Sequence, residues 1–461
     1  MADRDGMTAG SRGEEAAGLS GASPQAEAQL RATGIDPQRL AIFRLGRPTH
    51  DLVHAMPHWA RRMVLGYILW VLLVLLHHLQ VALPPWAMAV LSLVTGLVVL
   101  NSACEVVVIA TERWAARLRW DAYAAGTLGE ILSTIPEFVV IGFLVPVSPL
   151  TAFVVALVTI YNNALAFSLY SYFLPKDQEG NFLMPKPITD AGTQILIGGA
   201  AMGFILGLVM LIFESGDRPK RSFEASELIV LSLLLFSIFG VYLYKLLKSY
   251  ASEEEEVQET LGLTHEQVEQ RKALVYESVD ESPLGRIVGL FVLGVAGSFA
   301  GGERVAAFAE ESIGGLGLNP VLAALILAAF AGMSEYVILY RAHRNRQYRI
   351  ALANAFGGIT QLMYLVLPFT LLAVGLYQGF VNPAHAELPI HFTLANTLLL
   401  LFLFPTFFVL VELLEKDHTL DILDTAIMAG IFLLLIVLLV VYGGVDGAGS
   451  MATAGAAAGS N

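Results

Sequence analysis

Cysteine is almost absent from this chain, because Cys104 is the only one among 461 residues. A lone cysteine excludes an internal disulfide framework and a cysteine-rich metal site. Charged residues are also scarce, at 15% of the sequence against about 25% in an average soluble protein. Hydrophobic residues make up 56%, and the mean hydropathy is +0.65. These values exclude an ordinary soluble domain and indicate a chain that crosses a membrane.

Several functional signatures are missing as well. No HExxH or GxSxG motif falls in an apolar helix and no Ser/His pair lies within one, which argues against a membrane-embedded hydrolase. No signal peptide is expected, since the first apolar stretch begins only near Met63. The net charge of -13 makes nucleic-acid binding unexpected. We expect no resident cofactor, and the partners we expect are membrane lipid and transported cations.

Long apolar segments dominate what is present. A membrane-spanning helix needs about 20 mostly apolar residues. Eleven segments meet this need: 63–82, 84–112, 120–144, 150–173, 189–213, 225–249, 285–309, 319–341, 350–377, 391–415 and 420–442. We therefore predict an all-α, polytopic membrane protein with about 11 transmembrane helices.

The segments and their flanks divide the chain into five parts. We expect a disordered or interfacial cytoplasmic tail (1–62), an extra helix plus a first five-helix repeat (63–249), an acidic cytoplasmic loop (250–284), a second five-helix repeat (285–442) and a flexible C-terminal tail (443–461). With the N-terminus inside, 23 of the 27 lysines and arginines fall on the inner side. The positive-inside rule then predicts a cell (inner) membrane protein whose N-terminus is cytoplasmic and whose C-terminus is outside.

Polar residues recur at equal spacing in the two halves. In each half a glutamate is followed 32 residues later by a second glutamate, and 26 residues after that by an amide: Glu105, Glu137 and Asn163, then Glu303, Glu335 and Gln361. Five helices per half place the second half in the membrane with the opposite orientation. The sequence therefore predicts an inverted repeat with a binding site near the bilayer midplane, where the halves meet.

Two of these glutamates carry the main functional prediction. A charge at mid-bilayer costs at least about 2.5–3.5 kcal/mol, so such a residue usually faces a cavity or a partner. Glu137 follows Pro136, which should break its helix and expose carbonyl oxygens for a cation. Near Glu335, the break must come from Gly332 or Ser334. The alternative for both glutamates is a protonated side chain that is hydrogen-bonded in a helix kink.

Further acids are candidate proton sites. Glu130 shares a helix face with Thr134 and Glu137, and it is either a third ligand or proton site or a protonated acid packed against a helix. Glu105 and Glu303 are candidate proton sites too, with inter-helix hydrogen bonding as the alternative.

Neutral oxygens accompany the carboxylates. Four side chains are candidate cation ligands beside the two glutamates, because a hard cation prefers oxygen: Thr134, Asn163, Asn354 and Gln361. The alternative for the amides is helix–helix hydrogen bonding.

The motifs resemble those of the calcium/cation antiporter superfamily, which includes sodium/calcium and calcium/proton exchangers. Ser-Thr-Ile-Pro-Glu at 133–137 resembles the family's first motif, and Asn354-Ala-Phe-Gly-Gly at 354–358 is similar to its second motif. The layout of eleven segments with an acidic loop between the sixth and seventh is similar to the calcium/proton branch. The family pattern is altered at Ser334, which stands in place of a second proline, and at Glu130.

The resemblance implies a Ca²⁺ site formed by Glu137 and Glu335 with neighbouring backbone carbonyls and amides. We therefore predict a secondary active antiporter, not an enzyme, that exports Ca²⁺ in exchange for H⁺ or Na⁺ by alternating access. Two alternatives stay open: a Na⁺ or K⁺/H⁺ antiporter on the same fold, and a non-transporting cation sensor.

Overall fold

The computed structural model describes most of the chain between residues 57 and 442. The described residues are 57–80, 83–118, 131–132, 134–177, 180–184, 192–215, 222–260, 283–344, 348–381, 390, 392, 394–416 and 418–442. The predictions for Glu130, for both chain ends and for most of the acidic loop lie outside these residues.

Helices form nearly all of the described structure, as predicted. The first half contains α3 (His58–His78), α4 (Pro85–Arg117), α6 (Ile135–Val147), α7 (Pro149–Ser171), α8 (Thr193–Ser215) and α9 (Ala225–Thr260). The second half contains α11 (Leu284–Glu310), α12 (Pro320–Ala331), α13 (Met333–Arg344), α14 (Tyr348–Gln361), α15 (Leu367–Leu376), α16 (Leu394–Leu401), α17 (Leu403–Glu415) and α18 (Ile422–Tyr442). Three π-helical turns follow α11, α14 and α15: η3 (Glu311–Gly315), η4 (Leu362–Val366) and η5 (Tyr377–Val381). Strands β1 (Phe182–Leu183) and β2 (Thr419–Leu420) pair antiparallel.

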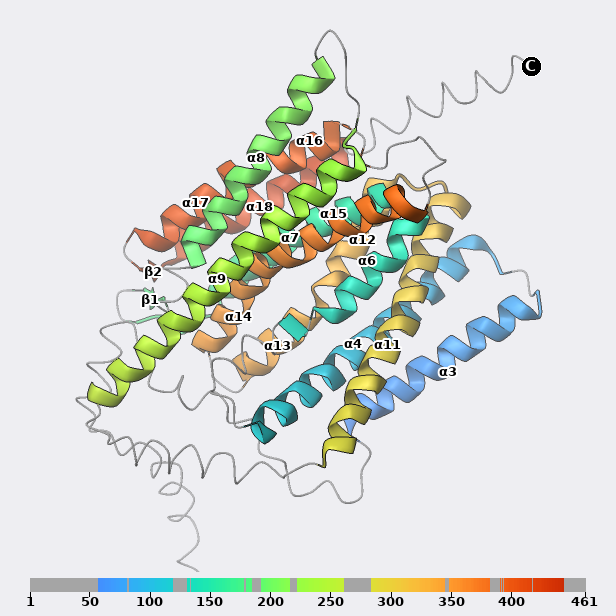
Figure 1. Ribbon diagram of the computed structural model, residues 1–461, viewed down its shortest axis with the longest axis horizontal. Helices are drawn as coiled ribbons and strands as arrows, with labels where there is room; N and C mark the ends of the chain where they lie inside the picture. The colour runs from blue at the N-terminus through green and yellow to red at the C-terminus, as the bar shows by residue number, and fades with distance from the viewer. Residues whose placement is uncertain are drawn as a thin grey trace, which may run out of the picture.

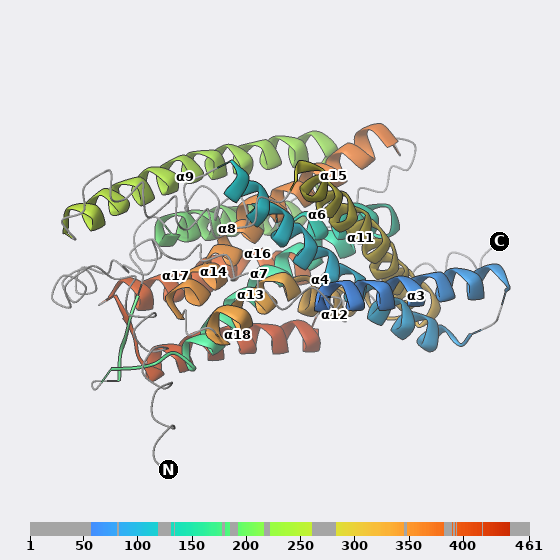
Figure 2. The same ribbon diagram turned by 90° about the horizontal axis from the view of Figure 1, so that it is seen from below.

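The helices have the length and composition of membrane spans. Within the described residues, nine helical segments are long and apolar enough to cross a membrane, and α6 and α12 add two shorter apolar helices. Large apolar side chains such as Ile68, Val230 and Val292 are more than half exposed, as expected where lipid replaces water. The chain is a multi-pass membrane protein, and α7 is the most buried of its long helices. Figure 2 shows α7 between α9 and α18, which lie on opposite sides.

The α4–α11 pair shows that the two halves are related by a two-fold arrangement. These helices run antiparallel and make the most extensive contact in the protein (Figure 1). A methyl group added to Gly96 would lie 3.0 Å from the Gly301 oxygen and 2.9 Å from Val305. The same contact recurs 198 residues on: a methyl on Gly294 would meet the Ala103 oxygen at 3.2 Å and Val107 at 2.6 Å.

That exchange of partners is what an inverted repeat requires. The glycine on α4 contacts two residues of α11, and the equivalent glycine on α11 contacts the equivalent two residues of α4. Small residues at these positions let the two backbones come close. The offset of 198 residues is the one that separates Glu137 from Glu335. The predicted inverted repeat is therefore confirmed by independent contacts.

Helix breaks occur at equivalent positions in the two halves. α6 begins at Ile135 after a turn at Thr134, and α13 begins at Met333 after a turn at Gly332. Thr134 and Gly332 are 198 residues apart. Pro136 lies in the first turn of α6, where its missing N–H costs nothing. The proline therefore starts the half-helix, and in the second half Gly332 provides the break.

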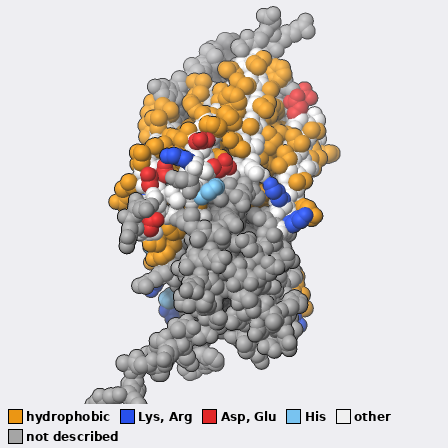
Figure 3. Space-filling model, turned by 90° about the vertical axis from the view of Figure 1, so that its left-hand side faces the viewer, with side chains coloured by type: hydrophobic (Ala, Val, Ile, Leu, Met, Phe, Trp, Pro, Cys, Tyr) orange, Lys and Arg blue, Asp and Glu red, His pale blue; other side chains and the backbone are white. Residues whose placement is uncertain are grey.

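Charged side chains lie together on one side of the protein, where several helices end. α4, α7, α9, α13 and α17 all end towards the lower left of Figure 1, where β1 pairs with β2. Figure 3 faces this side and shows acidic, basic and histidine side chains together, with hydrophobic side chains above them.

Several boundaries differ from those predicted, and two of the differences change where charged residues lie. α3 begins at His58, so Arg61 and Arg62 lie within that helix. α9 continues to Thr260, which places the acidic run at 253–256 inside that helix. In both cases helical hydrogen bonding extends beyond the apolar stretch, which hydropathy alone does not register.

Candidate cation site

The two central glutamates occupy the same place in two half-helices. Glu137 is in the first turn of α6 and Glu335 in the first turn of α13. Their exposed fractions are only 6% and 8%. The first turn of a helix carries unsatisfied N–H groups and a partial positive charge, which favour a carboxylate there. The helix breaks therefore let two acids be held inside an apolar bundle.

Asn163 joins the second of these half-helices to α7. A methyl group on Gly332 would lie 2.5 Å from Asn163 Oδ1, and one on Gly358 would lie 3.6 Å from Asn163 Nδ2. The Gly358 methyl would also approach the Glu335 Cγ atom to 3.0 Å. The amide of Asn163 and the side chain of Glu335 thus lie against the same glycine of α14. Both glycines are needed because any Cβ would fill this space.

The Asn163 amide is buried and makes no hydrogen bond within the described structure. Asn163 is 3% exposed, and neither its Oδ1 nor its Nδ2 atom has a hydrogen-bond partner among the residues that the structure describes. An unsatisfied buried polar group costs about 1–3 kcal/mol. Such a group beside a carboxylate indicates a place for a polar ligand.

A small cavity reaches the first carboxylate. It has a volume of about 40 Å³ and is lined mostly by apolar side chains, with Glu137, Asn101, Cys104 and Thr159 as its polar members. A buried water needs about 10–15 Å³ of such volume, so the cavity has room for about three waters or a partly hydrated ion.

The two carboxylates act on a shared region. The negative charges of Glu137 and Glu335 both reach Cys104 on α4, and both reach Tyr336 on α13. In the described part of the chain no three His, Cys, Asp or Glu side chains cluster as a metal centre. A cation there would rely on two carboxylates and on neutral oxygens.

The remaining predicted ligands differ in their burial and in their position relative to the cavity. Thr134 is 1% exposed, and its hydroxyl donates to the Ile131 carbonyl at 2.6 Å, within the turn that precedes α6. Gln361 is 7% exposed and immediately precedes Leu362, which lines the cavity. Asn354 is half-buried and does not line the cavity, although its Nδ2 atom is also without a hydrogen-bond partner in the described structure.

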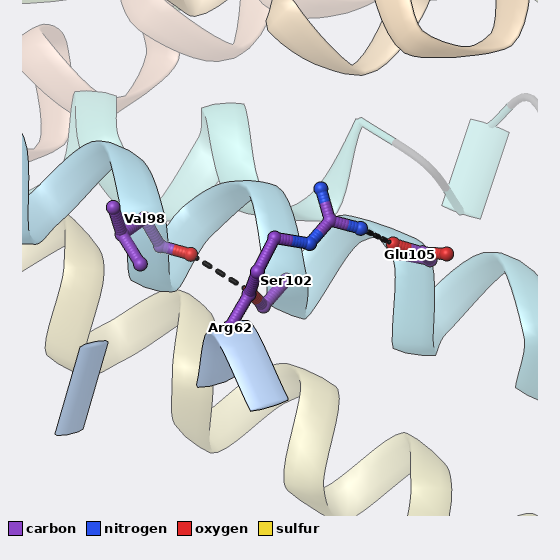
Figure 4. Close-up of polar contacts among 4 residues, drawn as sticks. All are labelled: Arg62, Val98, Ser102 and Glu105. Carbon is purple, nitrogen blue, oxygen red and sulfur yellow. Dashed lines mark hydrogen bonds and ion pairs between the residues drawn. The ribbon is translucent and has the colours of Figure 1, made fainter. Parts of the chain in front are cut away.

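Glu105 and Glu303 are held by other contacts. Arg62 of α3 forms an ion pair with Glu105, beside a turn of α4 in which Ser102 donates to the Val98 carbonyl (Figure 4). Trp70, also on α3, donates to Glu303 at 2.9 Å. These contacts favour the inter-helix alternative over a proton site.

Arg304 also contacts Glu303. Neighbouring helical residues do not ordinarily face each other, yet Arg304 forms an ion pair with Glu303. Its long side chain reaches back along the helix, which the spacing rule for short side chains does not allow for.

A layer of rings lies two helical turns from the second carboxylate. Tyr170 follows Asn163 by seven residues on α7, and His343 follows Glu335 by eight on α13. The Tyr170 hydroxyl and His343 Nδ1 are 3.3 Å apart, and Tyr348 of α14 packs edge-on against His343 with ring centroids 5.2 Å apart. The layer connects the three helices that surround Asn163.

Three residues of this region were missed in the sequence analysis. Asn101 and Cys104 line the cavity, and Tyr336 is reached by both carboxylates. Asn101 and Cys104 are small polar residues on the helix that carries Glu105, and they share a face at helical spacing. Tyr336 directly follows Glu335, and comparison with Phe138 at the equivalent position would have singled it out.

Chemically, the arrangement suits a hard cation. Two carboxylates provide charge, and amide, hydroxyl and carbonyl oxygens provide neutral ligands of the type that Ca²⁺ takes. The helix breaks place these groups within an otherwise apolar bundle.

Comparison with known proteins agrees with this arrangement. Residues 286–441 match the family model described as sodium/calcium exchanger protein. A comparison with curated protein sequences found no match.

Solved structures share the fold over most of the chain. The H⁺/Ca²⁺ exchanger CAX is 15% identical with a TM-score of 0.55, and the match covers 83% of this chain and 89% of that one. Native YfkE is 14% identical with a TM-score of 0.54, covering 82% and 98%. A second structure of YfkE, described as a Ca²⁺/H⁺ antiporter protein, is 15% identical with a TM-score of 0.52, covering 81% and 99%.

Members of the matched family are secondary transporters that exchange cations, and the fold extends across both halves of the chain. Residues 286–441 therefore resemble the sodium/calcium exchanger family, and more than four-fifths of the chain shares the fold of solved calcium/proton exchangers.

Proposed function

We propose that the protein is a secondary active antiporter that exports Ca²⁺ in exchange for H⁺ by alternating access. The observation that carries the proposal is the buried amide of Asn163, which lies between Gly332 and Gly358 beside Glu335 with both polar atoms unsatisfied in the described structure. A bound cation would satisfy its oxygen.

Charge favours a divalent cargo. Glu137 and Glu335 together supply two negative charges, which one divalent ion neutralises, and the cavity of about 40 Å³ borders Glu137. Ca²⁺ takes six to eight oxygens in flexible geometry, whereas Mg²⁺ demands a strict octahedron and gives up its water reluctantly. The mixed set of Glu137, Glu335, Asn163, Thr134 and Gln361, completed by backbone carbonyls and water, suits the former.

Protons are the favoured counter-ion. A carboxylate buried in an apolar bundle takes up a proton when its cation leaves, so two such acids allow two protons to replace one Ca²⁺. Glu130 keeps its predicted role as an additional proton site. The solved structures of like fold are named as H⁺/Ca²⁺ or Ca²⁺/H⁺ exchangers, which supports the same pairing.

The inverted repeat supplies the means of alternating access. Two halves with opposite orientation can exchange conformations, which opens a central site to one side and then to the other. We place the protein in the cell (inner) membrane with its N-terminus cytoplasmic, because the basic residues concentrate on that side.

Ion-dependent thermal stabilisation tests the cargo directly. A ligand that binds the folded state raises its stability in proportion to the logarithm of its concentration. The purified full chain should be stabilised by Ca²⁺ at concentrations where Mg²⁺, Na⁺ and K⁺ have no effect. Stabilisation by Na⁺ or K⁺ alone would support the monovalent antiporter instead. Ca²⁺ binding without H⁺-driven Ca²⁺ flux in proteoliposomes would support a sensor.

A further inference from the structure

The residue after each central glutamate differs between the two halves. Phe138 follows Glu137, and Tyr336 follows Glu335 at the equivalent position. Phe138 has no polar side-chain atom and packs against Phe369, with ring centroids 4.5 Å apart. The second half therefore places a phenolic oxygen where the first half places only a ring.

The Tyr336 hydroxyl lies at the helix break. The side chain points back along α13 over Gly332, so that a methyl on Gly332 would lie 3.1 Å from both the Tyr336 Cζ and Oη atoms. Asn163 Oδ1 would lie 2.5 Å from the same methyl. The phenolic oxygen and the amide oxygen thus both border the Cα atom at which the helix carrying Glu335 is interrupted.

Both carboxylates act on this hydroxyl. Tyr336 lies within electrostatic range of both Glu335 and Glu137, which belong to different halves of the protein, and the effect of Glu335 is the larger. A phenol can donate one hydrogen bond and accept through its oxygen. It can therefore donate to a carboxylate when no cation is present and turn an oxygen lone pair to a cation when one is bound.

We propose that Tyr336 is a specificity-determining residue of the cation site, and that its hydroxyl supplies a neutral oxygen which favours Ca²⁺ over Mg²⁺. The inference rests on the proposed function. A further neutral oxygen raises the number of available protein ligands without adding charge. That benefits a cation which accepts six to eight oxygens more than one which is limited to six and retains its waters.

A packing role makes a different prediction. If the ring merely fills space above Gly332, phenylalanine serves equally well, because it keeps the ring and removes only the oxygen. Tyr336→Phe therefore separates the two roles, and it also gives the second half the residue that the first half already has.

The test measures Ca²⁺-dependent and Mg²⁺-dependent thermal stabilisation of the purified full chain. For Tyr336→Phe we expect the Ca²⁺ concentration that gives a fixed rise in melting temperature to increase by about tenfold, with little change for Mg²⁺. Tyr364→Phe is the matched control, because Tyr364 is also a buried tyrosine and its hydroxyl donates to the Ile195 carbonyl at 3.0 Å. That variant should lower the cation-free melting temperature and leave the Ca²⁺ response unchanged.

A second variant guards against misfolding. Tyr336→His keeps a polar ring, and it should fall between wild type and Tyr336→Phe in Ca²⁺ response. A wild-type Ca²⁺ response that both Tyr336 variants retain in full overturns this inference alone. A wild-type chain that responds to no cation overturns the proposed function together with it.

Discussion

Asn163 of α7 packs directly against Gly332, the residue at which the helix carrying Glu335 is interrupted. The contact joins a buried amide of the first half to the helix break of the second half. It leaves no room for a side chain at 332, since a methyl there would meet Asn163 Oδ1 at 2.5 Å. The glycine thus serves both the break and the site.

Gly332→Ala should weaken cation binding because the new methyl displaces the Asn163 amide. We expect at least about a tenfold rise in the Ca²⁺ concentration that gives a fixed rise in melting temperature. Gly240→Ala on α9 is the control, since a methyl there meets nothing within 4 Å. An unchanged Ca²⁺ response in Gly332→Ala would show that Asn163 does not serve the site.

Gly301→Ala tests the α4–α11 contact. The methyl would lie 3.0 Å from the Leu100 backbone nitrogen and 3.1 Å from the Gly96 oxygen, and backbone atoms cannot move aside cheaply. We expect a destabilisation of about 1–3 kcal/mol. Gly289→Ala on the same helix faces open space and should stabilise by up to about 1 kcal/mol through helix propensity. Thermal unfolding in detergent compares the two, and equal effects would contradict the close approach.

Arg62→Ala tests whether Glu105 is structural. The substitution removes the guanidinium from a glutamate whose side chain is 8% exposed, and we expect a loss of about 1–3 kcal/mol. Adding Glu105→Gln should recover part of that loss, because the glutamine carries no charge that would be left buried without the Arg62 guanidinium. Thermal unfolding of the two single variants and the double variant measures the coupling.

Transport by Glu105→Gln decides between the two roles for this acid. H⁺-driven flux in proteoliposomes should persist, because the structure pairs Glu105 with Arg62 of α3. Loss of flux in a stably folded Glu105→Gln variant would restore the proton-site prediction.

The start of α18 gives a pH-dependent prediction. Asp421 and Asp424 accept hydrogen bonds from each other's backbone N–H groups, at 2.7 and 3.1 Å. The bond from the Asp424 N–H, above all, lowers the pKa of Asp421 below its usual value of about 3.9. A lowered pKa contributes stability that is present above pH 4 and is lost as the pH falls through the folded-state value.

Asp421→Ala should therefore cost about 0.5–2 kcal/mol at pH 7, typical of a lost helix cap. Asp421→Asn keeps an acceptor oxygen and should cost less. Thermal unfolding from pH 7 to pH 3 should show both differences shrinking at the acid end. A difference that grows as the pH falls would contradict the cap.

The sequence predicted the helices and the repeat well for physical reasons. A span must satisfy its backbone internally and present apolar side chains to lipid, so hydropathy locates it within a few residues. The offset between Glu137 and Glu335 located both halves, and the Gly96 and Gly294 contacts confirm it.

The details of the site depended on three-dimensional contacts. No spacing rule places Arg62 of the extra helix on Glu105, because that ion pair joins helices outside the repeat relationship. Asn101 and Cys104 belong to the cavity only because α4, α6 and α7 all border it. Tyr336 was overlooked because an aromatic residue in an apolar helix is ordinarily read as packing.

The central claim is that Glu137 and Glu335 form one cation site, divided between the halves. H⁺-gradient-driven ⁴⁵Ca²⁺ uptake into proteoliposomes tests it most directly, with wild type, Glu137→Gln and Glu335→Gln compared at equal reconstituted amounts. The account predicts uptake by wild type and none by either single variant, although both keep a cooperative thermal transition. Full uptake by both glutamine variants would contradict it.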